Sequence, residues 1–137
     1  MSKEQNMATQ EKLGASAVGG DFDAFDDVFA EDVVDHDPAP EQGSGPDGFK
    51  SFFKTLRSAF PDMNIEAEHV VQDEDNVAIA YTLTGTHDGE FQGVAATGKQ
   101  IKVRGMQIGR FEDGKIVERW GATDELSIMR QIGAVPE

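Results

Sequence analysis

Cysteine is absent from this chain of 137 residues, which excludes disulfides, thiolate catalysis and cysteine-based zinc sites. Positive charge is scarce, since 12 Lys and Arg residues accompany 26 Asp and Glu residues and the formal net charge is −14. Such a surface repels phosphate groups, so we expect neither nucleic acid nor an anionic membrane as a partner. No apolar run approaches the roughly 20 residues that span a bilayer. Because segment 1–13 also lacks the apolar core of a signal peptide, we expect a cytoplasmic protein.

The acidic residues gather in segments 21–37 and 73–75. A solvated acidic surface is the simplest explanation for them. Adaptation to high salt, in which acidic surfaces keep proteins soluble, is the alternative. A melting temperature that falls as salt is raised to molar concentration would count against the alternative.

Three segments in the first half of the chain have helical character. Helix formers without proline extend over residues 3–18, and Gly19-Gly20 ends this segment. Asp21 is placed to cap a short second helix, on which three aromatic residues predict one buried face: Phe22, Phe25 and Phe29. A third helix opens at Pro46 and stops before Pro61, and its apolar residues follow helical spacing: Phe49, Phe52, Phe53, Leu56 and Phe60.

Strand patterns dominate the second half of the chain. β-branched residues alternate with others from Val77 onward, which is the most regular strand pattern in the sequence. The segment 88–99 is rich in glycine and is predicted to be irregular. The predicted strands cover residues 33–36, 65–71, 77–87, 101–111 and 115 to about 123.

Asp113-Gly114 lies between two apolar-patterned runs and is a strong signal of a β-hairpin. A two-residue loop there would bring Phe111 opposite Ile116 and Gln107 opposite Trp120. One face would then carry Val103, Gln107, Phe111, Ile116, Trp120 and Asp124. The other face would carry Arg104, Met106, Ile108, Arg110 and Arg119. A bulge in either strand would reverse part of this assignment.

Helices followed by an antiparallel meander are typical of an α+β fold. We therefore predict a single domain over residues 1–137, with residues 1–6 as a mobile tail. The N-terminal helices would pack on a strongly curved, mainly antiparallel sheet and form a cone with an internal pocket. Such a pocket suits a small apolar ligand.

Several short motifs follow one another along the chain: His36-Asp37-Pro38, Ala59-Phe60-Pro61-Asp62, the glycine-rich segment from Gly85 to Lys99, the strand pair from Phe111 to Trp120, and Gln131-Ile132-Gly133. Their order and spacing resemble those of the SnoaL-like polyketide cyclase, or ester cyclase, family over about residues 33–133. The family belongs to a superfamily that resembles nuclear transport factor 2. Because that superfamily contains both enzymes and simple binding proteins, the fold leaves the function open.

The resemblance implies an intramolecular aldol condensation without a metal or a cofactor. It also implies that the aspartate after the last-strand tryptophan, here Asp124, acts as the acid and base. Burial beside Trp120 and Val103 would make its carboxylate a stronger base. The alternative for Asp124 is the N-cap of a terminal helical turn. A position of this carboxylate in bulk water, or a hollow filled with side chains, would end the enzymatic hypothesis that rests on it.

His87 and His36 are further catalytic candidates, because an imidazole can donate to an enolate oxygen or orient a carboxylate. His87 has the parity of the pocket-facing strand residues, but an exposed turn beside Asp88 is an equal alternative. His36 could act in the pocket or only close the turn before Pro38.

Three strand residues are predicted to bind the substrate, with core packing as the alternative for the aromatic ones: Tyr81, Gln107 and Trp120.

Metal ligation is not predicted, because the histidines and acids lack a short ligand spacing.

The leading hypothesis is a cofactor-free cyclase, or a related isomerase or lyase, that acts on a small apolar carbonyl compound. The alternative is a non-catalytic ligand-binding or dimerisation module, in which Met106 and Ile108 would form the interface of a dimer or tetramer. Hydrolysis of an epoxide or ester is a third hypothesis, which needs Asp35 or Asp37 as a second acid beside Asp124.

Overall fold

The computed structural model describes residues 3–135. Its elements are α1 (Lys3–Gly19), the 3₁₀ turn η1 (Phe22–Ala24), α2 (Phe25–Val28), β1 (Phe29–Asp35), α3 (Gly45–Ala59), β2 (Asn64–Gln72), β3 (Asn76–Thr86), β4 (Gln100–Glu112), β5 (Lys115–Thr123) and α4 (Glu125–Gln131). Within this part of the chain, no helix combines the length and apolar character needed to cross a membrane.

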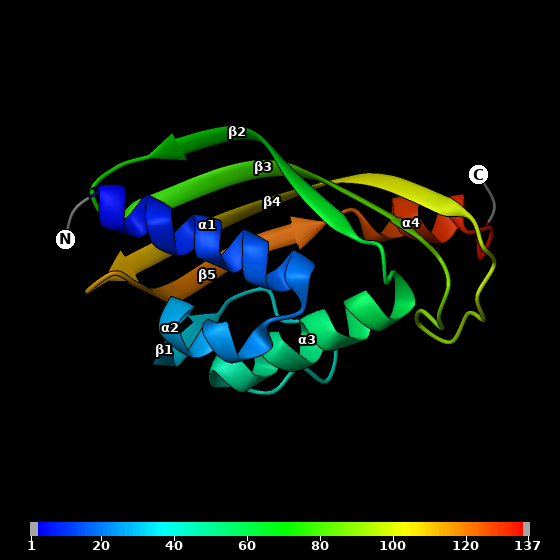
Figure 1. Cartoon of the computed structure of the whole chain (residues 1–137), viewed down its shortest axis with the longest axis horizontal. Helices are drawn as coiled ribbons and strands as arrows, with labels where there is room; N and C mark the ends of the chain where they lie inside the picture. The colour runs from blue at the N-terminus through cyan, green and yellow to red at the C-terminus, as the bar shows by residue number, and fades with distance from the viewer. Residues whose placement is uncertain (1–2, 136–137) are drawn as a thin grey trace.

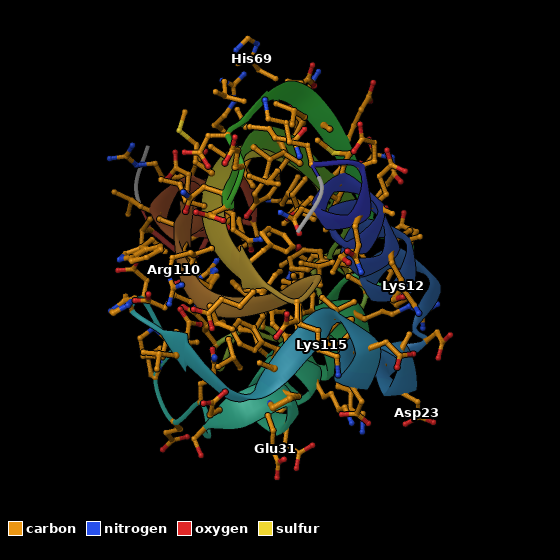
Figure 2. All side chains as sticks on the ribbon, turned by 90° about the vertical axis from the view of Figure 1, so that its left-hand side faces the viewer. Lys12, Asp23, Glu31, His69, Arg110 and Lys115 are labelled. Carbon is orange, nitrogen blue, oxygen red and sulfur yellow. The ribbon has the colours of Figure 1, made fainter. Side chains whose placement is uncertain are left out.

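The five strands form one sheet in the order β1-β5-β4-β3-β2. β2 to β5 are an antiparallel meander, and β1 pairs with β5 in parallel. Figure 1 shows α1 and α3 on the same side of this sheet. Figure 2 shows the strands curling around the interior, with α1 on the side opposite β4. The predicted α+β class, with helices packed on a strongly curved and mainly antiparallel sheet, is confirmed.

α1 begins and ends close to the predicted bounds. Residues 3–6, which we predicted to belong to a mobile tail, form its first turn, and Asn6 is buried. Residues 1 and 2, the rest of that predicted tail, lie outside the described residues. The helix ends at Gly19, and Gly20 follows with φ of 80°, a left-handed conformation that glycine adopts at little cost.

The second helix is much shorter than predicted. Asp21 precedes η1, but its side chain makes no capping hydrogen bond. α2 is a single turn, and Phe29 already belongs to β1, which pairs with β5 through Ile116. Phe25 and Phe29 are nevertheless buried and pack edge to face, with ring centroids 5.7 Å apart. Strand pairing therefore overrides the helical spacing of the aromatic residues without changing their burial.

Two clusters of buried side chains form the core. The first lies under α1, α2 and the start of α3 and consists of Leu13, Ala17, Phe25, Val28, Phe29, Val33, Phe49, Val77, Phe111 and Ile116. The second lies between the end of α3, α4 and the glycine-rich loop and consists of Leu56, Ala59, Phe60, Met63, Leu83, Phe91, Ile101, Val103, Ile128 and Ile132. The division leaves space between the clusters on the inner face of the sheet.

The β4–β5 hairpin forms at Asp113-Gly114 as predicted, with Phe111 opposite Ile116. The predicted register is wrong beyond this pair. Val117 is an extra residue in β5, because the pairs on either side of it are made by Ile116 and Glu118 while β4 has no residue between their partners. A bulge of this kind moves every later residue of the strand to the opposite face.

Trp120 and Arg119 exchange faces as a result. Trp120 lies opposite Ile108, on the outer face of the sheet, instead of opposite Gln107. Gln107 lies opposite Gly121, and Arg119 occupies the inner face that we predicted for Trp120. The bulge therefore changes which side chains of β5 reach the interior.

Candidate functional site

A cavity of about 570 Å³ lies between the two core clusters. It is bounded by α1, α3, the loop 37–42 and the inner face of the sheet. α3 and the sheet supply its apolar wall, which consists of Phe49, Phe52, Phe53, Leu56, Ile65, Ala67, Val70, Ile79 and Leu83. Its volume and its mostly apolar wall are typical of sites for small molecules.

Two glycines on the inner face make room for the polar side chains of this cavity. A Cβ atom at Gly105 would overlap the phenol ring of Tyr81. A Cβ atom at Gly121 would lie 2.8 Å from Nη2 of Arg119. Glycine inside a strand often marks such a close approach, and here it lets the phenol and the guanidinium lie across the sheet.

Arg119 and Asp35 form an ion pair in the cavity wall. Arg119 Nη1 lies 3.2 Å from Asp35 Oδ1, and the two side chains are 15% and 8% exposed. The parallel pairing of β1 with β5 brings these residues opposite each other. Arg119 also donates from Nε to Gln107 Oε1 at 3.3 Å and from Nη1 to the Asp37 carbonyl at 3.4 Å. These bonds fix the guanidinium plane.

The Nη2 group of Arg119 takes no part in this hydrogen-bond network. A guanidinium carries five N–H donors, and the bonds within residues 3–135 use only Nε and Nη1. Nη2 lies over Gly121, which lines the cavity. It can therefore donate to an oxygen atom of a bound molecule.

Asp35 is held by three donors. Its Oδ1 accepts from Arg119 and from the backbone N–H of Asp37 at 3.0 Å, and its Oδ2 accepts from Gln42 Nε2 at 3.0 Å. A carboxylate offers about four acceptor positions, so one remains on Oδ2. The neighbouring carboxylate of Asp37 accepts from the backbone N–H of Gly121 at 2.8 Å.

Tyr81 and Gln107, two of the residues predicted to bind the substrate, line the cavity. The Tyr81 hydroxyl lies 2.7 Å from Thr123 Oγ1, and either group can donate. Gln107 orients Arg119. The polar end of the cavity thus combines a guanidinium, a carboxylate and a hydroxyl pair, which together can bind and polarise a carbonyl group.

Asp124 is exposed and does not line this cavity. Its Oδ1 accepts from the backbone N–H of Ser127 at 3.0 Å, so it is the N-cap of α4. The predicted apolar setting is wrong, because the bulge in β5 moves Trp120 to the sheet face opposite that of Val103, and Asp124 is exposed. The catalytic role of Asp124 stays a prediction, and its exposure removes the support that we gave for it.

His87 is fully buried but does not line the cavity. Its Nδ1 lies 3.0 Å from Thr97 Oγ1, and its ring packs against Phe60 with centroids 5.6 Å apart. Both alternatives drawn from the sequence, a pocket position and an exposed turn, therefore miss its position under the glycine-rich loop. Its catalytic role is not supported by contact with the cavity.

His36 and Trp120 lie together outside the cavity. Their rings stack with centroids 4.7 Å apart, and His36 Nε2 lies 2.8 Å from Glu118 Oε2. Hydrogen bonds from His36 and then from Arg110 lower the pKa of the Glu118 carboxyl below its ordinary value of 4.5. The predicted role of Trp120 in the pocket is wrong in position, and His36 belongs to the same outer cluster.

Sequence reasoning considered Asp35 only as a second acid and assigned Arg119 to the wrong face. The adjacent apolar residues Ile116 and Val117 break the strand alternation and could have indicated the bulge. Nothing local in the sequence indicated that β1 would pair with β5. Within residues 3–135, no group of three or more His, Asp or Glu side chains is arranged to hold a metal ion.

Comparisons with known proteins agree with this fold. The family model of the SnoaL-like polyketide cyclases matches residues 9–132. TsrD from Streptomyces laurentii is 23% identical, with a TM-score of 0.89 over 98% of this chain and 99% of that one. IdmH from Streptomyces antibioticus is 28% identical, with a TM-score of 0.83 over 94% and 99%. A SnoaL-like polyketide cyclase from Agrobacterium tumefaciens is 22% identical, with a TM-score of 0.76 over 93% and 98%. No relative was found among the curated proteins.

Proposed function

Because the chain belongs to the SnoaL-like polyketide cyclase family, we propose that it catalyses cofactor-free acid–base chemistry on a small carbonyl compound in its cavity. The reaction is an intramolecular aldol-type cyclisation or a related isomerisation. The ion pair of Arg119 and Asp35 in an apolar cavity wall carries the proposal. Asp35 takes the place of Asp124, the base predicted from the sequence, since the Asp124 carboxylate faces solvent.

Arg119 binds the oxygen of the substrate carbonyl through Nη2. The negative charge that develops on this oxygen during enolate formation is stabilised by a cation that is already fixed in the cavity wall. The bonds from Arg119 to Gln107 and Asp35 hold the guanidinium before the substrate arrives, so little reorganisation is needed. The hydroxyl pair of Tyr81 and Thr123 offers a second donor on the same face.

Asp35 removes the proton from the carbon next to the carbonyl. The remaining acceptor position on Oδ2 takes the proton, and the enolate carbon then attacks a second carbonyl carbon of the same molecule. The protonated Asp35 then returns this proton to the alkoxide formed by the attack, which regenerates the base, so no metal or redox cofactor enters the balance. The apolar wall from α3 lies beside the substrate in this arrangement.

Proton exchange provides a test that does not require the natural substrate. 2-Acetylnaphthalene is a flat apolar ketone whose methyl protons are next to the carbonyl. In D₂O, the wild-type protein should accelerate the replacement of these protons by deuterium, followed by NMR. Asp35→Asn should lower the rate by at least about 100-fold, the usual contribution of a general base. Asp124→Asn should keep the rate within about twofold, because Asn caps a helix as well as Asp does.

The outcomes separate the two carboxylates. Full exchange by a folded Asp35→Asn variant would contradict the assignment of Asp35 as base, and loss of exchange in Asp124→Asn would restore the assignment predicted from the sequence. Circular dichroism and a melting curve must accompany both variants. Removal of Asp35 leaves Arg119 without its anionic partner in the wall, which destabilises the fold.

A non-catalytic ligand-binding protein is the second candidate function. It is favoured by the three donors that hold Asp35, since such a carboxylate can serve mainly to fix Arg119. In that case the protein binds 2-acetylnaphthalene, but the wild type and Asp35→Asn exchange its protons equally slowly. Isothermal titration with the same ketone distinguishes this outcome from an empty cavity.

A further inference from the structure

Gln10 lies on the face of α1 that lines the cavity, and its side chain has an unused hydrogen-bonding group. The residue is 8% exposed. Its amide oxygen is buried and has no hydrogen-bond partner among residues 3–135. A buried amide without a partner destabilises a folded chain, so a position of this kind needs an explanation.

The other glutamines of the cavity wall are bound to protein atoms. Gln42 donates to Asp35 and accepts from the backbone N–H of Ala39. Gln107 accepts from Arg119. These two amides build the polar end of the cavity, whereas the Gln10 oxygen accepts no hydrogen bond from residues 3–135.

Gln10 also belongs to a different wall from the Arg119–Asp35 pair. α1 packs against β2 and β3, whereas Asp35 and Arg119 belong to the β1–β5 pair. Figure 1 shows α1 crossing in front of the sheet, away from β1. The cavity is also lined by apolar side chains, which include Phe52, Phe53 and Ile79.

We propose that Gln10 binds a hydroxyl or carbonyl group at the end of the ligand that is remote from Arg119 and Asp35. The amide of Gln10 can both donate and accept, so a hydroxyl group satisfies it best. The ligand class is therefore an apolar carbonyl compound with a second polar group at its opposite end. This inference rests on the proposed function only in that the cavity holds a carbonyl compound.

Two matched ketones and one substitution test the proposal. 6-Acetyl-2-naphthol differs from 2-acetylnaphthalene by one hydroxyl group at the end remote from the acetyl group. Calorimetric titration should show that the wild type binds the naphthol about tenfold more tightly, the effect of one well-formed hydrogen bond. Gln10→Met keeps the side-chain length and removes the amide, and it should bind both ketones equally.

Gln72→Met is the matched control. Gln72 lies on β2 outside the cavity and donates to the Lys3 carbonyl, so this variant should keep the preference for the naphthol. A preference that survives in Gln10→Met, or a wild type without any preference, would overturn the proposal. The expected loss of proton exchange in Asp35→Asn does not depend on either of these results. The proposed function and this inference can therefore fail separately.

The melting temperature supplies a test that needs no ligand. Met and Gln have similar helix propensities, and Gln10 makes no hydrogen bond through its buried oxygen, so Gln10→Met should leave the melting temperature unchanged or raise it. A fall of several degrees would show that the amide supports α1, for example through the nearby Asn6, and would overturn the assignment to a ligand.

Discussion

The sequence allows two roles for the Asp124 carboxylate, and the structure supports one of them. Its place after the last strand matches the acid–base position that the family resemblance implies, and its place before Glu125 matches a helix cap. The bond from Ser127 N–H to its Oδ1 selects the cap. The carboxylate accepts from the first turn of α4 and is exposed, and Asp124 is not among the residues that line the cavity.

Substitution of Asp124 by Ala should therefore affect stability rather than chemistry. We expect the free energy of unfolding to fall by about 0.5–2 kcal/mol, because the first turn of α4 loses its side-chain acceptor. Asp124→Asn should retain most of the stability. Urea unfolding followed by circular dichroism gives both values. Equal stability of the wild type and Asp124→Ala would show that the cap contributes nothing to the fold.

At the scale of elements, Asp62 connects the turn after α3 to the end of β3. Its two oxygens accept from the backbone N–H and the hydroxyl of Thr86, both at 2.7 Å. The hydroxyl first and the N–H second lower the pKa of the Asp62 carboxyl below its ordinary value of 3.8. Because the unfolded chain protonates more readily than the folded one, this interaction stabilises the fold above pH 3.8 and is lost as the pH falls through the folded-state pKa.

Asp62→Asn should consequently be less stable than the wild type at pH 7, and the difference should shrink below about pH 3.8. Urea midpoints at a series of pH values between 7 and 2.5 measure the difference. Glu66→Gln, a change on the exposed strand β2, is the control and should show a small difference at every pH. A stability difference that widens in acid would contradict a lowered pKa of Asp62 in the folded chain.

The bulge at Val117 also acts at this scale, since it decides which residues of β5 reach the cavity. The hairpin tip follows from local chemistry, because Asp-Gly forms a tight turn almost independently of the rest of the chain. The alternation of β5 is interrupted where Ile116 and Val117 are both apolar. Whether the extra residue bulges or shifts the hairpin depends on pairing with β4 and β1, which no local pattern reveals.

At the scale of the whole molecule, no helix within residues 3–135 covers the outer face of the sheet around Met106 and Ile108. Pairing across the strands brings apolar residues together in two adjacent rows, Val71-Ala78-Ile108-Trp120 and Ala80-Met106-Ala122. Met106 and Ile108 are 56% and 43% exposed. Arg110 follows Ile108 on the outer face and His69 pairs with Ala80 at the end of the second row, and Figure 2 shows both side chains pointing outward. An apolar centre with a polar rim is the composition of a protein interface.

We propose that a second copy of the chain covers this face, as the outward row in the sequence led us to expect. Light scattering should give twice the chain mass of 14.9 kDa for the wild type and the single mass for Ile108→Lys. Leu126→Lys changes an exposed apolar residue on α4 and should leave the dimer intact. A wild type that stays monomeric at high concentration would contradict the proposal.

The sequence by itself determined the α+β class, the bounds of α1 and α3, the hairpin tip and most of the buried aromatic residues. These features depend on residue periodicity and on turn residues such as Gly20 and Gly114, which act over a few positions. Tertiary structure alone decided that Arg119 and Asp35 meet in the cavity wall and that Trp120 lies on the outer face of the sheet. The reason is physical: parallel pairing of β1 with β5 joins segments about 80 residues apart, and a single bulged residue reverses a strand face, so both depend on contacts that no local pattern encodes.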